Sequence, residues 1–424
     1  MRTAKAILPV RSCLTDKMDL PELKEKLIKY GQPELAEIID AAETVSGIDL
    51  ELVSGLYRMA SSGDRTAEEG DIAPIPVTVE DELDRVTRER YIRAGERLIR
   101  TGGFAAVTMA GGQGTRLGHN GPKGTYDIGV DEHSLFEIQA RRLLRRAAIS
   151  GGAQIPWYIM TSGENDSATK AFFEANGYFG YAPENVRFFK QFMLPMVGFD
   201  GRIIRDSFTS VKMGADGHGG VFRAMQAGGV IEDMKARGVR YAFIGGIDNV
   251  LVKLCDPLFI GFAYLNDLPC AGKSLIKRDP FEKAGVFCLK NGRPYVVEYT
   301  EISEEMARAT DEAGNYIYGD AHILCNIFRI DTLEDAAGRS LPYHVAVKKT
   351  RYVDANGEIT EPEKPNAYKF EAFIFDAFSR CDNMGILRVK REYEFAPVKN
   401  REGEDSPATA RELYESAKAR GKLD

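Results

Sequence analysis

The chain has 424 residues, of which 44% are hydrophobic and 28% charged, and its net charge is −7. The length allows two or three domains, and the composition is ordinary for a globular protein. The acidic balance argues against nucleic-acid binding, which needs a basic face, and no apolar run approaches the ~20 residues of a membrane helix. The apolar stretch near the N-terminus is too short for a signal peptide core, so we expect a cytoplasmic protein.

The first part of the chain, residues 1–98, is predicted to be a helical region followed by an arm. Apolar residues repeat at helical period within residues 19–58, and Asp19 and Glu22 have capping-box spacing. A polar stretch with glycine and proline at residues 61–76 predicts a linker or an extended arm. A charged helical stretch then covers residues 81–101, and Gly102 and Gly103 end it.

From residue 104 onward, apolar strands alternate with helices. We expect strands at 104–110, 155–160, 186–189 and 241–244, with helices at 135–148 and 166–176 between them. This alternation predicts an α/β fold with a doubly wound, mostly parallel, Rossmann-like sheet over residues 99–380. Ligands of such sheets lie beyond the carboxyl ends of the strands, so side chains that follow these strands are expected to converge.

The last third of the chain contains hairpin signals. Asn291-Gly292 separates two strand-like runs and Asn356-Gly357 follows another, which predicts antiparallel hairpins added to one side of the sheet. A helix is predicted from residue 407 to 420 with Ser406 as N-cap, in a short C-terminal segment, residues 381–424. Helical spacing and a core position are also predicted for Phe370, Phe373, Ile374, Ala377 and Phe378.

A glycine-rich stretch, Met109-Ala-Gly-Gly-Gln-Gly-Thr-Arg-Leu-Gly118, follows the first of these strands. Glycine lets a ligand approach the backbone closely, and successive exposed N–H groups form a concavity that attracts anions. Arg116 and Lys123 add two cations that suit phosphate. The stretch therefore predicts a loop that holds nucleotide phosphates.

Two familiar phosphate loops do not fit this spacing. A Walker A loop needs Gly-Lys-Ser/Thr, and the dinucleotide fingerprint needs a third glycine where Leu117 stands. A tight turn between a strand and a helix, without any ligand, is the alternative interpretation. The two cations favour the phosphate loop over that alternative.

Three further positions are candidates for ligand contact. Asp248 follows a buried strand and could hold Mg²⁺ together with substrate phosphates, although it could equally cap a helix. Gln191 could read a base edge through its amide, and His218 lies in a second glycine loop, Asp216–Gly220. The six cysteines contain no Cys-x-x-Cys pair, which predicts free buried thiols and not a zinc site.

The ordered motifs of the chain, over roughly residues 20–400, resemble those of the UDP-N-acetylglucosamine and UDP-sugar pyrophosphorylases, a eukaryotic-type family of nucleotide-sugar uridylyltransferases. The resemblance rests on the glycine loop with Pro122-Lys-Gly124 and on motifs at residues 155–163, 193–195, 199–201, 216–220, 232–234, 248–249, 256–257, 297–299, 364–366 and 395–399. It implies a nucleotidyltransferase that joins UTP and a sugar 1-phosphate to give a UDP-sugar and pyrophosphate, with Mg²⁺ as cofactor.

The resemblance also implies roles for single residues. Gly111, Gly112 and Gln191 would hold the uridine base, and Asp248 would hold the metal. Arg116, Lys123 and Lys399 would be the catalytic cations that grip the phosphates. Glu298 would bind sugar hydroxyls. The rest of the implied substrate-binding set is Gly114, Thr115, Gly217, His218, Gly219, Asn249, Gly285 and His322.

The chain departs from the family pattern at the sugar side. His218 and His322 stand where the acetylglucosamine enzymes have Asn, and Gly-His-Gly is similar to UDP-glucose and broad UDP-sugar pyrophosphorylases. N-acetylglucosamine 1-phosphate and a hexose 1-phosphate such as glucose 1-phosphate both remain candidate acceptors. A catalytically silent nucleotide-sugar sensor is the alternative of another class. We further expect a monomer or weak dimer, no membrane or nucleic-acid partner, and a chain that largely lacks the family's C-terminal β-domain.

Overall fold

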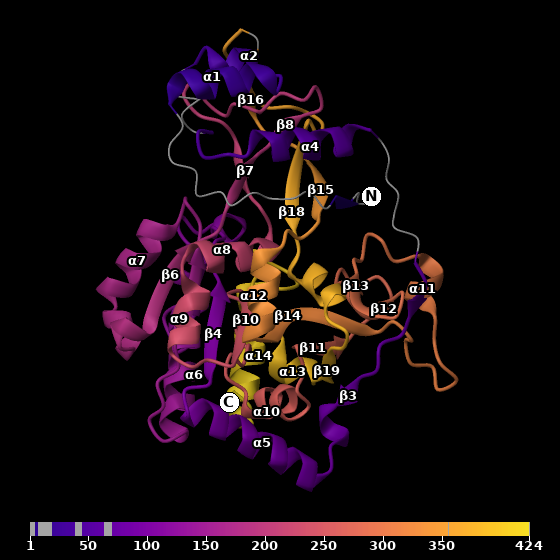
Figure 1. Ribbon diagram of the computed structural model, residues 1–424. Coiled ribbons are helices and arrows are strands. Elements are labelled where there is room, and N and C mark those ends of the chain that lie inside the picture. The colour runs from indigo at the N-terminus through magenta and orange to yellow at the C-terminus, as the bar shows by residue number, and fades with distance from the viewer. Residues whose placement is uncertain (1–4, 7–18, 39–44, 63–69, 355, 424) are drawn as a thin grey trace. The chain divides into compact units, whose positions relative to one another are not determined.

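The computed structural model describes residues 5–6, 19–38, 45–62, 70–354 and 356–423 (Figure 1). Contacts group the chain into two compact units, each assembled from three segments. The first unit comprises Met1–Glu69, Phe192–Gly220 and Ala336–Ala377, and the second comprises Gly70–Gln191, Val221–Asp335 and Phe378–Asp424. The division into residues 1–98, 99–380 and 381–424 therefore stays a prediction, since the contacts follow other boundaries.

The second unit is built on a mixed sheet with the strand order β3-β19-β11-β14-β10-β4-β5-β6, to which a hairpin and β2 are attached. Strands β10, β4, β5 and β6 run parallel to one another, as the alternation of apolar strands and helices predicts. Its strands are β2 (Ile72–Ala73), β3 (Thr78–Val79), β4 (Phe104–Met109), β5 (Trp157–Thr161), β6 (Val186–Lys190), β10 (Tyr241–Gly246), β11 (Cys270–Ile276), β12 (Val286–Lys290), β13 (Arg293–Val297), β14 (Asp320–Arg329) and β19 (Gly385–Arg388).

Helices connect the parallel strands (Figure 1). Along the chain, β4, α6, β5, α7 and β6 come first, and α8, α9 and β10 follow after the segment Phe192–Gly220 of the first unit. Apolar side chains of β4, β5, β6, β10, α6 and α7 share one core cluster with α10 and α14. The helices of this unit are α5 (Arg85–Arg100), α6 (Leu135–Ile149), α7 (Asp166–Ala175), α8 (Val221–Ala227), α9 (Val230–Ala236), α10 (Pro257–Leu265), α11 (Glu304–Arg308), α13 (Arg391–Glu394) and α14 (Pro407–Ala419). The mostly parallel α/β fold is thus confirmed.

One strand lies where the sequence did not indicate it. The antiparallel strand β14 is inserted between β10 and β11, inside the sheet, and not only at its side. The expected hairpin is present, because β12 and β13 pair across Asn291 and Gly292, which have φ values of 52° and 75°. β12 then pairs with the start of β14 through Val286 and Ala321, so the hairpin extends the sheet from this inserted strand.

The first unit contains the N-terminal helices and a small antiparallel sheet with the order β1-β15-β18-β8. Asp19 caps the first helix by accepting a hydrogen bond from the amide of Glu22, as the spacing predicts. Residues 39–42 of the predicted helical region and residues 63–69 of the predicted linker lie outside the described residues. The elements are α1 (Leu20–Lys29), α2 (Pro33–Ala36), α4 (Leu50–Ser61), β1 (Lys5–Ala6), β7 (Met193–Pro195), β8 (Val197–Gly198), β9 (Met213–Ala215), β15 (Tyr343–Lys348), β16 (Tyr352–Val353), β17 (Ile359–Thr360) and β18 (Ala367–Ala372), and α12 (Ile330–Gly338) runs from one unit into the other.

One predicted helix is wrong. Phe370 lies in strand β18, where it pairs with Val345 of β15, and only the following residues form a 3-10 helix, η7 (Ile374–Arg380). A strand followed by a helical turn produces the same apolar spacing as one helix, and pairing with β15 satisfies the backbone of Phe370. The predicted core position of Phe370 is nevertheless confirmed, since its side chain is buried.

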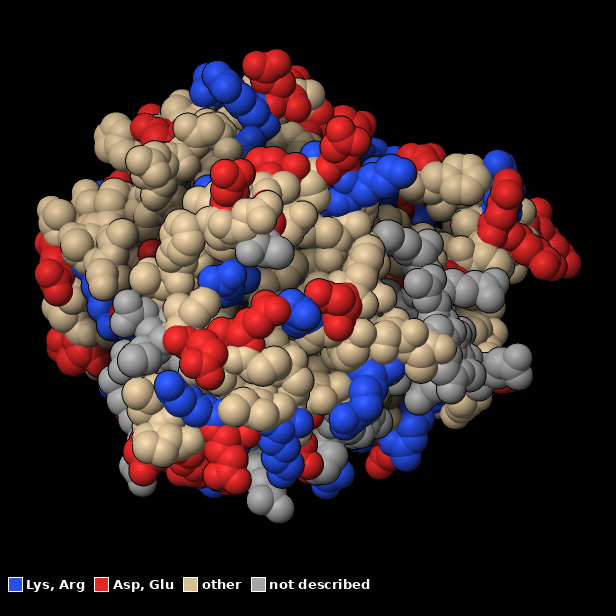
Figure 2. Space-filling view, turned by 90° about the horizontal axis from the view of Figure 1, so that it is seen from above, with Lys and Arg blue, Asp and Glu red and all other residues tan. Residues whose placement is uncertain are grey.

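Within the described part of the chain, Cys255, Cys270, Cys288, Cys325 and Cys381 are buried thiols that form no disulfide, as predicted, whereas Cys13 lies outside it. On the face that Figure 2 shows, acidic and basic side chains are interspersed, in keeping with the net charge. The helices that the structure describes include none with the length and apolar character to span a membrane.

Candidate active site

The glycine loop after β4 is closed on itself by backbone hydrogen bonds. The amide of Gly114 donates to the carbonyl of Gly121 at 2.9 Å, and the amide of Lys123 donates to the carbonyl of Gly112 at 3.0 Å. Between them lies a short 3-10 helix, η2 (Thr115–Leu117). These two bonds bring Lys123 back beside the start of the loop, although eleven residues separate it from Gly112 in sequence.

Asn165 supports this loop from the turn after β5. Its side-chain nitrogen donates to the carbonyl of Ala110 at 2.9 Å and to that of Gly112 at 3.3 Å. Its side-chain oxygen accepts the amide of Ser162 at 2.8 Å, which holds the Asn165 amide in this orientation. The sequence reasoning missed Asn165, because nothing in its neighbourhood shows that it reaches a loop 53 residues away.

The first amides of the loop are available as donors. Among the described residues, no group accepts a hydrogen bond from the backbone N–H of Gly111, Gly112 or Gln113. Gly112 is exposed, and a Cβ added to it would meet no atom within 4 Å. Adjacent unpaired N–H groups on an exposed turn form a concavity that attracts anionic or carbonyl oxygens.

Gln191 lies directly against this loop. It follows β6, where its amide donates to the carbonyl of Thr161 at 2.8 Å, and its side chain reaches the backbone of Gly111. A Cβ added to Gly111 would lie 2.3 Å from Oε1 of Gln191, a distance that real Cβ atoms do not tolerate. The structure thus brings together Gly111, Gly112 and Gln191, the three residues predicted to hold a base.

A cluster of charges faces the same loop. Nζ of Lys123 lies 3.7 Å from Oδ2 of Asp248, and the two side chains are 17% and 29% exposed. Burial lowers the pKa of Lys123, and the positive charges of Lys399 and Arg116 lower it further, while Asp248 acts in the opposite direction. The predicted catalytic cations and the predicted metal ligand are therefore electrostatic neighbours.

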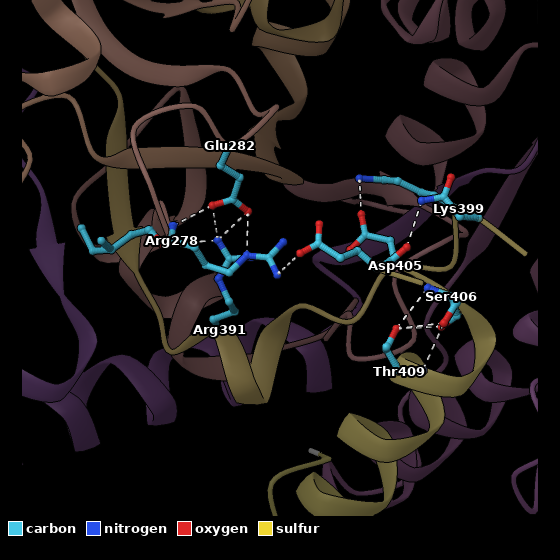
Figure 3. A network of polar contacts seen from close by, with 10 residues as sticks. Arg278, Glu282, Arg391, Lys399, Asp405, Ser406 and Thr409 are labelled. Carbon is cyan, nitrogen blue, oxygen red and sulfur yellow. Dashed lines mark hydrogen bonds and ion pairs between the residues drawn. The ribbon is translucent and has the colours of Figure 1, made fainter. Parts of the chain in front are cut away.

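Lys399 is positioned by the loop that leads into α14 (Figure 3). Its amide donates to the carbonyl of Asp405 at 2.7 Å, and its Nζ lies 3.7 Å from the Asp405 carboxylate. The following residue, Ser406, caps α14 in a capping box with Thr409, as the sequence predicts for Ser406. Nζ of Lys399 also lies 5.5 Å from the centre of the Phe395 ring, a cation–π distance.

Asn249 joins the metal-ligand loop to the C-terminal segment. Its side-chain oxygen accepts the amides of Leu251 and Ala396, and its side-chain nitrogen donates to the carbonyl of Glu394 at 2.7 Å. Next to it, the carbonyl of Asp248 accepts the amide of Val398 at 2.8 Å. The buried side-chain amide of Asn249 is therefore hydrogen-bonded to backbone groups on both sides. In this structure Asn249 holds the segment of Asp248 against the segment of Lys399.

A second group of predicted residues meets near the start of β14. The amide of His322 donates to the carbonyl of Gly285 at 2.9 Å, and a Cβ on Gly285 would lie 3.1 Å from Oε1 of Glu298. Nε2 of His322 lies 3.1 Å from Oδ1 of Asn326, a buried side chain that the sequence reasoning missed. Because β14 runs antiparallel to β10 and its first residues extend past Gly245, His322 lies beyond the carboxyl end of β10.

The remaining predicted residues, Gly217, His218 and Gly219, belong to the first unit. His218 opens a 3-10 helix, η6 (His218–Gly220), and its Nδ1 accepts the amide of Ile374 at 3.0 Å. Nδ1 therefore carries no proton, and a neutral ring presents its N–H at Nε2. The ring stacks on Phe373 with a centroid distance of 5.2 Å.

The donor set near Asp248 suits a magnesium ion that takes most of its ligands from a substrate. Among the described residues, no group of three or more His, Cys, Asp or Glu side chains could hold a metal by itself. Mg²⁺ commonly binds one or two carboxylates and completes its shell with phosphate oxygens and water. The single, partly exposed carboxylate of Asp248 beside the glycine loop fits this arrangement.

The fold and the charges around the loop define an α/β protein of the nucleotidyltransferase type. The chain belongs to the UTP--glucose-1-phosphate uridylyltransferase family, whose model matches residues 71–417. Its members are enzymes that transfer uridylyl groups.

Three individual proteins show how similar this chain is to other members of the family. The chain is 39% identical over 373 residues to UDP-N-acetylglucosamine pyrophosphorylase of Saccharomyces cerevisiae, which covers 84% of this chain and 78% of the yeast protein. It is 41% identical over 341 residues to UDP-N-acetylhexosamine pyrophosphorylase-like protein 1 of Homo sapiens, covering 78% and 67% of the two chains. The solved UDP-N-acetylglucosamine pyrophosphorylase of Trypanosoma brucei superposes with a TM-score of 0.83 at 28% identity, over 96% of this chain and 86% of that one.

Proposed function

We propose that this chain catalyses the transfer of a uridylyl group from UTP to N-acetylglucosamine 1-phosphate, forming UDP-N-acetylglucosamine and pyrophosphate. One observation carries the proposal: Arg116, Lys123 and Lys399 gather beside Asp248 at a glycine loop with free backbone donors. The names of the yeast and trypanosome relatives support the acetylated sugar as acceptor.

The proposed reaction suits these residue types. A phosphate oxygen of the sugar 1-phosphate attacks the α-phosphorus of UTP and forms a new P–O bond. The bond from the α-phosphorus to the oxygen that bridges it to the β-phosphorus breaks, and pyrophosphate leaves with that electron pair. The nucleophile is already an anion, so no general base is needed, and the barrier consists of charge repulsion and alignment.

Each charged residue would then have a separate task. Lys123 and Arg116 would neutralise the triphosphate, and Lys399 would contact the phosphates from the C-terminal segment. Asp248 would hold Mg²⁺, which stabilises negative charge on the phosphates when bound. Gly111, Gly112 and Gln191 would bind the base, because the two backbone amides donate while the Gln191 amide can both donate and accept.

The sugar would lie near the group formed by Gly285, Glu298 and His322. The carboxylate of Glu298 can accept hydrogen bonds from two sugar hydroxyls, and an imidazole can donate or accept one. Gly114 and Thr115 would complete the loop around the phosphates, and the family motifs imply a substrate-binding role for Gly217, His218 and Gly219. These assignments rest on the family motifs and on the neighbours described above.

A second acceptor, glucose 1-phosphate, is favoured by one specific feature. His218 and His322 replace the two Asn residues expected in enzymes for the acetylated sugar. A side-chain amide offers both an oxygen and an NH₂ group to an acetamido substituent, whereas a neutral imidazole offers one donor and one acceptor on a rigid ring. A silent sensor is not favoured, because a sensor need not retain Arg116, Lys123, Lys399 and Asp248 together.

The deciding experiment measures pyrophosphate release from UTP and Mg²⁺ with N-acetylglucosamine 1-phosphate, N-acetylgalactosamine 1-phosphate, glucose 1-phosphate and galactose 1-phosphate. We expect the highest kcat/KM with N-acetylglucosamine 1-phosphate. A preference for glucose 1-phosphate would establish the second candidate instead. UTP binding without pyrophosphate release for any acceptor would overturn the enzyme assignment and establish the sensor.

The cellular and quaternary properties stay predictions. A cytoplasmic location would be checked by fractionation, and a monomer or weak dimer by light scattering over a range of concentrations.

A further inference from the structure

A buried ammonium group lies behind the charged residues of the candidate active site. Lys273, on strand β11, has a side chain that is 1% exposed. Its Nζ lies 2.8 Å from Oδ2 of Asp256 and 2.9 Å from Oε2 of Glu394. The proposed chemistry does not use Lys273, and a lysine is rarely buried this completely unless its charge is paired.

The two carboxylates belong to the two segments that carry Asp248 and Lys399. Asp256 caps α10 by accepting the amide of Leu258 at 3.0 Å, and it follows Asp248 by eight residues on the same segment. Glu394 ends α13 and precedes Lys399 by five residues. The ammonium of Lys273 therefore ties the segment of the proposed metal ligand to the segment of a proposed catalytic cation.

The cluster is balanced in charge. Lys253 lies with its Nζ 3.2 Å from Oε1 of Glu394, so two ammonium groups face two carboxylates. Burial by itself would favour the neutral amine, but the charges of Asp256 and Glu394 outweigh it and raise the pKa of Lys273. Burial would likewise raise the pKa of Asp256, and the opposing charges of Lys273 and Lys253 instead lower it to about 2.

A second network holds α13 from its more exposed side (Figure 3). The guanidinium of Arg391 donates to both carboxylate oxygens of Glu282, at 2.8 and 2.7 Å. Glu282 also accepts the amide of Arg278 at 2.7 Å, and these residues follow β11. Strand β11 and the residues after it thus fix both ends of α13, by Lys273 at Glu394 and by Glu282 at Arg391.

We propose that Lys273 is a positioning residue for uridylyl transfer, which sets the spacing between Asp248 and Lys399 through its ion pairs with Asp256 and Glu394. The inference rests on the proposed function, and it adds a residue that touches neither substrate nor metal. Such a residue matters because a displacement of about 1 Å between reacting groups can lower a rate by about 10²-fold.

The test compares Lys273→Met with a double variant, Lys273→Met/Glu394→Gln. The single variant removes the ammonium and leaves two buried carboxylates with Lys253 alone, so it is destabilised as well as misaligned. The double variant removes the excess charge and restores the melting temperature, yet it still lacks the ion pairs by which Lys273 joins the two segments. Lys235→Met, which breaks an ion pair with Glu334 on the surface, is the matched control.

Turnover per folded molecule and the Kd of UTP from calorimetry are measured for each variant. We expect kcat to fall by about 10²-fold in both Lys273 variants, with an unchanged KM for the sugar 1-phosphate and with the control at the wild-type level. Recovery of kcat together with the melting temperature in the double variant would show a purely structural role and overturn the proposal.

The UTP measurement separates this proposal from the proposed function. If the wild-type protein releases no pyrophosphate with any acceptor, the proposed function fails, but displaced cations should still weaken UTP binding in both Lys273 variants. An unchanged Kd for UTP in both variants would then overturn the positioning role independently.

Discussion

The ammonium of Lys123 and the carboxylate of Asp248 face one another across 3.7 Å, and both side chains are partly buried at the glycine loop. Each group neutralises the other before any ligand is considered. A triphosphate that arrives with a metal ion would divide this pair, since the phosphates attract the ammonium and the metal attracts the carboxylate. The pair therefore suits a ligand that brings negative phosphates and a positive metal ion together.

Replacing Lys123 by Met should lower turnover without weakening the fold. Burial and the charges of Lys399 and Arg116 together outweigh the attraction of Asp248 and lower the pKa of Lys123, so an apolar side chain of similar length causes no net loss of stability. Loss of one preorganised cation at a site of developing charge typically lowers kcat by about 10²- to 10³-fold. Steady-state kinetics and thermal melting check this, with Lys418→Met as a surface control. Turnover near the wild-type value would remove Lys123 from the mechanism.

Binding of UTP should take up a proton on the alkaline side of neutrality. The pKa of Lys123 is lowered in the protein alone by burial and by Lys399 and Arg116. The negative triphosphate favours the ammonium and raises that pKa, so at pH values between the two pKa values a proton is bound together with UTP. The affinity for UTP should therefore fall as the pH rises through the lowered pKa of Lys123 towards the ordinary lysine value of about 10.4.

Calorimetry in buffers of different ionisation enthalpy measures this proton uptake directly. In Lys123→Met the uptake should disappear. Equal uptake in the variant and the wild-type protein would assign the proton to another group.

Two glycine substitutions in the loop should raise the KM for UTP for different reasons. In Gly111→Ala the new Cβ would collide with the Gln191 amide at 2.3 Å, so Gln191 must move and the KM for UTP should rise by about tenfold or more. In Gly112→Ala the new Cβ meets no protein atom, so the loop and Gln191 stay in place. A rise in KM for Gly112→Ala would then report close approach of the ligand itself.

Crystallography of both variants, together with kinetics for UTP and for the sugar 1-phosphate, distinguishes the two causes. An unmoved Gln191 in Gly111→Ala would contradict the first expectation.

The two histidines should control which sugar is accepted. Replacing His218 and His322 by Asn restores the amide groups expected for the acetylated sugar, so the ratio of kcat/KM for N-acetylglucosamine 1-phosphate over glucose 1-phosphate should rise by about 10-fold or more. His133→Asn, on an exposed position, is the matched control. An unchanged ratio in the double variant would mean that other side chains recognise the acetamido group.

Much of the sheet could be predicted because buried parallel strands are continuous apolar runs. Strand β4 is buried at every position, and β5 likewise, which makes both visible in the sequence. The position of β14 was not visible, because pairing direction depends on where distant strands lie. The spacing at Phe370 was misread for a related reason, since a strand running into a 3-10 helix imitates one helix.

The residues of the candidate site also include some whose proximity could be predicted from the sequence and some whose proximity could not. Gly111, Gln191 and Asp248 could be expected to meet, because each follows a strand of the parallel group and such ends share one edge. Asn165 and Lys273 could not, because their partners lie far away in the sequence: Lys273 pairs with residues 17 positions before it and 121 positions after it. A single lysine within a strand carries no local signal of such partners.

The interleaving of the two units has a consequence for synthesis on the ribosome. Strand β3 pairs with β19 through Val79 and Arg388, so it is made long before its partner. At about 5–20 residues per second, roughly 15–60 s pass between the two. The first unit likewise needs β18 to pair with β8. Neither unit can therefore be completed while most of the chain is still untranslated. Until then the nascent polypeptide exposes unpaired strand edges, which can bind chaperones and which promote aggregation when translation is slow.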